Sequence, residues 1–137
     1  MERIIKLFIL IITIGFVAQS VSAAAAPSAP QTYNPYGAPG KVTLPQCIKT
    51  FNAGYEKLFF LTEAAIANNN FNVEELQSQG GYIVFSAGSY KFLATVISFG
   101  TNKAILKITP CNNNYTFPPL IIRNVFRYIE ANQYKKF

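Results

Sequence analysis

Apolar side chains recur every three or four residues in two segments of the chain, and this spacing predicts two helices. The first segment lies within residues 48–66, and the second lies within residues 120–132. The triplet Asn68 to Asn70 ends the first pattern, because asparagine tolerates the left-handed backbone that closes a helix. The apolar positions are Ile48, Phe51, Tyr55, Leu58, Phe59, Thr62, Ala65 and Ile66 in the first helix and Ile121, Ile122, Val125, Phe126 and Ile129 in the second.

Short β-rich runs separated by glycine-containing turns lie between the two helical segments. They predict strands at 82–87, 91–99 and 103–109, with a short edge strand at 72–78. Such short turns join antiparallel neighbours, because a parallel pair needs a crossover of about a dozen residues or more. We therefore expect an α+β fold with an N-terminal helix, a three- to four-stranded antiparallel meander and a C-terminal helix, both helices packing on one face of the sheet.

The middle strand of the meander is apolar on both faces. Phe92 and Val96 point to one side, whereas Leu93 and Ile97 point to the other. A strand of this kind is usually covered on both sides, yet two helices on one face leave the other face open. We therefore expect an exposed apolar surface, which is typical of an interaction site. The residues assigned to it are Phe92, Leu93, Ile97, Phe99 and Ile105 from the strands and Tyr115 and Phe117 from the following loop.

The N-terminus has the three parts of a secretory signal. Arg3 and Lys6 give a positive start, residues 7–17 are almost wholly apolar, and small residues precede the bond after Ala23. The apolar run is shorter than the roughly 20 residues of a membrane-spanning helix. We therefore expect cleavage of residues 1–23, export to the periplasm or the medium, and no stable membrane span. An uncleaved anchor is the alternative.

The composition changes after the signal. Residues 24–45 are rich in proline and alanine, which predicts a disordered linker. The small α+β domain is expected at 46–132, followed by a frayed tail at 133–137.

The absence of several residue types excludes most catalytic chemistry. The chain contains no His and no Asp, which removes Ser-His-Asp and Cys-His catalysis, histidine metal sites and EF-hand loops. Glu74 and Glu75 are adjacent, so on a regular strand they face opposite ways and cannot act on one substrate. We therefore expect no enzyme activity, no cofactor and no metal.

The net charge of +6 at pH 7 is compatible with anionic partners, but the basic residues are scattered, and only Lys135 and Lys136 are adjacent. We interpret them as a solvated surface and expect no nucleic-acid partner.

The two cysteines, Cys47 and Cys111, favour a disulfide in an exported chain. This bond would close a loop of about 65 residues and contribute ~4 kcal/mol. Two free thiols are the alternative.

These patterns favour a small non-enzymatic binding domain whose partner is another protein or a second copy of the chain. Carriage of a small apolar ligand or lipid between the helices and the sheet is the alternative function. An enzyme ranks third.

Overall fold

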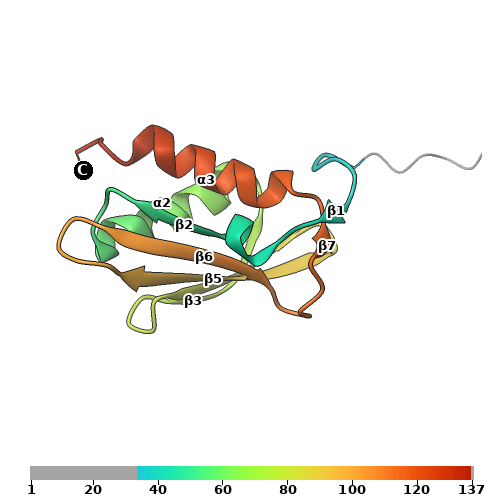
Figure 1. Ribbon diagram of the computed structural model, residues 1–137, viewed down its shortest axis with the longest axis horizontal. Helices are drawn as coiled ribbons and strands as arrows, with labels where there is room; N and C mark the ends of the chain where they lie inside the picture. The colour runs from blue at the N-terminus through green and yellow to red at the C-terminus, as the bar shows by residue number, and fades with distance from the viewer. Residues whose placement is uncertain (1–33, 137) are drawn as a thin grey trace, which may run out of the picture. The chain divides into compact units, whose positions relative to one another are not determined.

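The computed structural model describes residues 34–136, which form two helices and two antiparallel sheets. The predicted α+β class with an antiparallel sheet is therefore confirmed. The predicted signal peptide at 1–23, residues 24–33 of the predicted linker and Phe137 lie outside the described residues. Figure 1 shows both helices on the same side of the larger sheet.

The larger sheet has five strands in the order β2-β6-β5-β4-β3. Strands β3 to β6 follow one another along the chain and form the predicted meander, whereas β2 adds to the free side of β6. The smaller sheet pairs β1 with β7. The bounds of the strands are β1 Gly40–Lys41, β2 Ile48–Phe51, β3 Asn72–Gln77, β4 Tyr82–Ala87, β5 Tyr90–Ser98, β6 Ala104–Pro110 and β7 Thr116–Phe117.

The first helix starts later than the sequence predicts. A 3-10 helix, η1 (Leu44–Cys47), leads into β2, and helix α2 covers only Tyr55–Asn68. Ile48 and Phe51 fit the helical spacing only by coincidence. A strand of four residues is too short for its own periodicity to show, so the pattern could not separate it from the helix that follows. Gly54, in an extended conformation, is the N-cap residue at the true start. Asn70 has a φ of 57° just beyond the end of α2, in agreement with the prediction for the asparagine triplet.

The core lies between the helices and one face of the larger sheet. Helix α3 (Leu120–Asn132) and α2 bury their apolar stripes there, against alternate residues of β4, β5 and β6. A row of aromatic rings runs through this core. The neighbouring ring pairs are Tyr36 with Phe71, Phe71 with Phe85, Phe85 with Phe92 and Phe92 with Phe117, at centroid distances of 5.4, 5.8, 5.4 and 5.0 Å.

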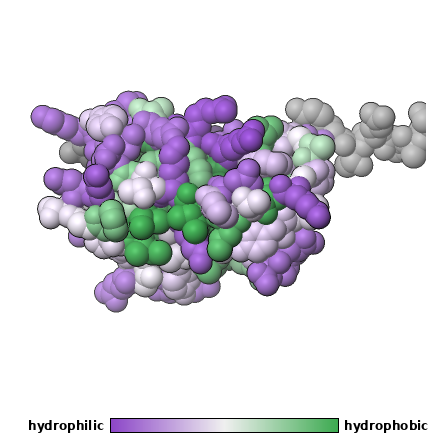
Figure 2. Space-filling view, viewed as in Figure 1, coloured by the Kyte–Doolittle hydropathy of each residue, from purple (hydrophilic) through white to green (hydrophobic). Residues whose placement is uncertain are grey.

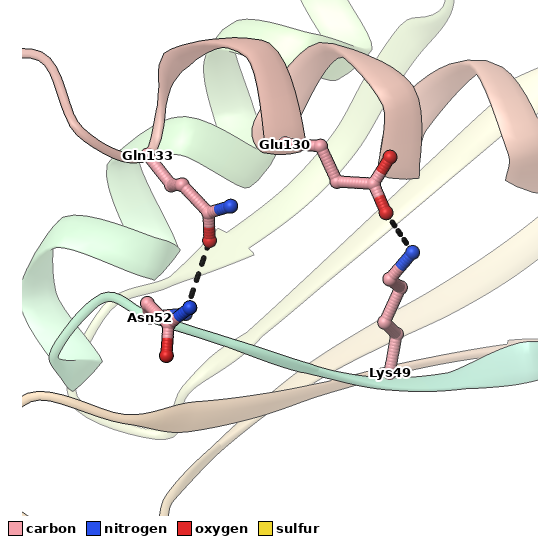
Figure 3. A network of polar contacts seen from close by, with 4 residues as sticks. All are labelled: Lys49, Asn52, Glu130 and Gln133. Atoms are coloured by element: carbon pink, nitrogen blue, oxygen red, sulfur yellow. Dashed lines mark hydrogen bonds and ion pairs between the residues drawn. The ribbon is translucent and has the colours of Figure 1, made fainter.

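Polar contacts hold α3 along the edge strand β2. The Lys49 ammonium forms an ion pair with the Glu130 carboxylate, and the backbone N–H of Asn52 donates to Oε1 of Gln133 at 3.0 Å (Figure 3). Gln133 directly follows the last residue of α3. The start of the predicted tail is therefore anchored to the sheet.

Part of the predicted linker belongs to the folded unit, which begins at Asn34. Val42 is buried and its backbone N–H donates to the carbonyl of Tyr115 at 2.9 Å. Tyr36 packs edge-on against Phe71. Residues 34–45 therefore cover one end of the core.

Candidate functional site

The two faces of the larger sheet differ in their surroundings. On the face toward the helices, alternate residues of β4, β5 and β6 are buried. On the opposite face, which we call the outer face, the alternating residues of the same strands are half-buried or exposed. Since both helices lie on the other side, no helix of residues 34–136 covers the outer face (Figure 1).

Apolar side chains gather on the outer face across β2, β6 and β5. Ile97 and Ile105 are directly paired across β5 and β6, and Ile97 is 45% exposed. Ile48 on β2 is 39% exposed, and Phe99, just after β5, is 60% exposed. Figure 2 shows this band of hydrophobic residues over the sheet. We call Ile48, Leu93, Ile97, Phe99 and Ile105 the outer patch.

Four of the residues that the sequence assigns to an interaction surface belong to the outer patch, and three do not. Leu93, Ile97, Phe99 and Ile105 lie in the patch, whereas Phe92 and Phe117 are 0% and 1% exposed and pack edge-on in the core. Tyr115, in the loop before β7, is partly buried and packs against the core. Ile48 was missed because its spacing placed it in the predicted helix.

A β-bulge places two glutamates on the outer face. Val73 pairs with Phe85 and Glu75 pairs with Val84, so Glu74 is an extra residue between them. The expectation that Glu74 and Glu75 face opposite ways was therefore wrong, because a bulge breaks the alternation of side chains.

Each of these glutamates has a partner on the neighbouring strands. The Glu74 carboxylate lies 2.7 Å from the Lys91 ammonium, which lowers the pKa of Glu74 and raises that of Lys91. The Tyr82 hydroxyl donates to Glu75 at 2.7 Å, and this hydrogen bond raises the pKa of Tyr82. The outer patch therefore has a polar, charged margin on the side of β3.

The predicted Cys47–Cys111 disulfide is absent, and both thiols are free. The register explains the error. Ile48 pairs with Lys107, so Cys47 lies level with Ile108, and Cys111, just past the end of β6, is three residues farther along the chain, about 10 Å away. Cys47 is buried, which raises its pKa, while Cys111 is exposed and its backbone N–H donates to the carbonyl of Lys91 at 3.0 Å. Disulfide geometry requires Cα atoms closer than about 7 Å.

A groove on the other side of β3 has no counterpart in the sequence-based prediction. Helix α2 and β3 enclose about 530 Å³ there, and the hydroxyl of Tyr55 donates to the carbonyl of Ser78 at 2.9 Å at its margin. We call this the α2–β3 groove. It is lined by Tyr55, Glu56, Phe59, Phe60, Glu63, Leu76, Ser78 and Gln79.

Within residues 34–136 no three Cys or Glu side chains come close enough together to hold a metal ion. In the same part of the chain, no helix has the length and apolar character needed to cross a membrane.

No protein family matches the chain, and no curated protein matches it significantly.

Proposed function

We propose that the protein is a small exported, non-enzymatic binding domain that associates with a second copy of itself through the outer patch. The supporting observation is the exposure of Ile48, Ile97 and Phe99 on a sheet face that the helices leave open. Apolar surface of this kind gains roughly 25 cal/mol per Å² when it is removed from water. Export rests on the signal pattern of residues 1–23.

The outer face is complementary to itself in charge, which favours a second copy over an unrelated protein. Strand β5 is central in the sheet order. A twofold axis parallel to β5 therefore sets β4 of one copy over β6 of the other. The same axis sets β3, which carries Glu75, over β2 of the other copy, next to Lys107 on β6, and it does so twice by symmetry. Opposite charges meet at the margin while the apolar residues meet at the centre.

The size of the face predicts a weak dimer. Five strands at about 4.8 Å spacing and about six residues at ~3.4 Å each give a face of roughly 400 Å². Stable complexes bury about 800 Å² on each partner. We therefore expect association in the micromolar range or weaker.

The experiment is sedimentation velocity over a wide range of concentrations, with two matched variants. Ile97→Lys places a charge in the patch and should weaken association by about tenfold or more, because an ammonium buried without a partner costs at least ~1.4 kcal/mol. Phe60→Lys introduces the same charge on α2, where the side chain is 67% exposed. It should leave association unchanged. A strictly monomeric protein, or equal effects of the two variants, would remove the basis of the proposal.

A second candidate function is carriage of a small apolar ligand. Between the helices and the sheet, Ile83, Phe85, Leu106 and Ile108 are fully buried. The α2–β3 groove could hold such a ligand, since its volume lies within the usual range for small-molecule sites of about 300–1,000 Å³. If the protein carries a ligand, native mass spectrometry of protein from its own host should show the mass of the chain plus the ligand. If it only dimerises, the same measurement should show only twice the mass of the chain.

A further inference from the structure

Acidic residues concentrate around strand β3 in a chain that is basic overall. The net charge is +6, yet four of the six acidic residues lie on the two sides of this one strand. Glu56 and Glu63 line the α2–β3 groove on the helix side. Glu74 and Glu75 lie on the outer side, and Lys91 offsets the charge of Glu74. The surroundings of β3 therefore attract cations.

Strand β3 also has a free backbone edge. It is the last strand in the sheet order and pairs only with β4, and all six of its residues are exposed. The bulge interrupts the regular pattern at Glu74, but Leu76 and Gln77 continue it in register with Ile83 and Tyr82. Exposed edges of this kind accept an added strand through main-chain hydrogen bonds.

The groove beside this edge supplies a place for an apolar side chain. Leu76 of β3 and Phe59 and Phe60 of α2 line it, and Phe60 is 67% exposed. In an added strand, successive side chains alternate between the groove and the outer side. Apolar groups can then enter the groove while cationic groups on the other side meet Glu75. Aromatic rings next to the glutamates also favour a cation at the groove margin.

From these features we infer that β3 and the α2–β3 groove bind an extended basic segment of a partner protein, in which lysine or arginine alternates with apolar residues. The segment pairs with the free edge of β3, its apolar side chains enter the groove beside Phe60 and Leu76, and its cations lie on the outer side facing Glu75. Glu56 and Glu63 add to the negative potential around the groove. A second copy of the chain does not fit here by β3-to-β3 pairing, because two acidic edges repel each other. This site lies beside the outer patch and shares only Glu75 with its margin.

The experiment measures binding of a labelled synthetic pentapeptide of alternating lysine and phenylalanine to the purified protein by fluorescence anisotropy. Two peptide controls accompany it, one with glutamate in place of lysine and one with alternate backbone nitrogens methylated. We expect binding of the basic peptide at low salt, weakening as salt is raised, and loss of binding with either control. Equal binding of the glutamate peptide would overturn the charge argument, and unchanged binding of the methylated peptide would overturn strand addition.

Variants of the protein separate this site from the outer patch. The double variant Glu56→Gln/Glu63→Gln should weaken peptide binding at low salt by about three- to tenfold, since it removes two of the negative charges that attract the cationic peptide. Phe60→Ser should weaken it as well, whereas Ile97→Lys should bind the peptide like the unmodified protein. Circular dichroism checks that each variant is folded. If the glutamine double variant binds as before, or if Ile97→Lys abolishes binding, the inference fails. The second of these outcomes would place the peptide on the outer patch.

Discussion

The two faces of β5 should respond very differently to the removal of apolar side chains. Phe92 is fully buried, stacks on Phe85 at 5.4 Å and meets Phe117 edge-on at 5.0 Å. Ile97, on the same strand, lies on the open face and is 45% exposed. Truncation of each to alanine therefore compares a core position with a surface position on one element.

The expected magnitudes are far apart. Phe92→Ala should lower the free energy of unfolding by about 3–5 kcal/mol through lost burial and an unfilled cavity. Ile97→Ala should change it by about 0.5 kcal/mol or less, as is usual for surface positions. With a urea m-value of about 1.5 kcal/mol/M, the first variant shifts the midpoint by about 2–3 M and the second by about 0.3 M.

The assay is urea unfolding followed by far-ultraviolet circular dichroism, with tyrosine fluorescence as a second probe because the chain has eight Tyr and no Trp. Protein concentration is kept low so that self-association does not add to stability. Because total stability of a small domain is about 5–15 kcal/mol, Phe92→Leu is a milder variant in case Phe92→Ala does not fold. Similar losses for the Phe92 and Ile97 variants would refute the division into a buried and an open face.

Three further predictions follow from the thiols and the N-terminus. A thiol reagent should titrate one cysteine, Cys111, in the native protein and two in denaturant, whereas a Cys47–Cys111 disulfide would give none without reduction. Burial raises the pKa of the Cys47 thiol in the folded state, so the thiol's contribution to stability is complete below the ordinary thiol pKa and is lost as the pH rises through the raised pKa. In urea unfolding between about pH 8 and 10, the free energy of unfolding should therefore fall less for Cys47→Ala than for the unmodified protein. Intact mass spectrometry of the exported protein should give a chain beginning at Ala24, and retention of residues 1–23 would contradict the export signal.

The meander was predictable because its turns and alternation are local signals. On β6, Leu106 and Ile108 alternate with Lys107 and Thr109, and the structure buries the first pair. On β5 the sequence does not show which set of alternating side chains faces the core, since Phe92 and Leu93 are both apolar. Only the position of the helices decides which of them enters the core. This is why the predicted interaction surface mixed core residues with residues of the outer patch.

The remaining errors come from contacts between segments distant in sequence. Strand β2 is stabilised by pairing with β6, which outweighs the helical spacing of Ile48 and Phe51. The same pairing sets the level of Cys47 and keeps it away from Cys111. The bulge at Glu74 depends on the register between β3 and β4, and no periodicity in the sequence marks it. Periodicity alone does not encode registers of this kind.

The most direct test of the proposed self-association is a dilution series by NMR with labelled methyl groups. We predict that the methyl signals of Leu93, Ile97 and Ile105 shift with protein concentration, while those of the buried helix residues Leu61 and Ile129 stay fixed. Signals that do not change up to millimolar concentration, or changes confined to α2 and β3, would contradict the assignment of the outer patch as the binding surface.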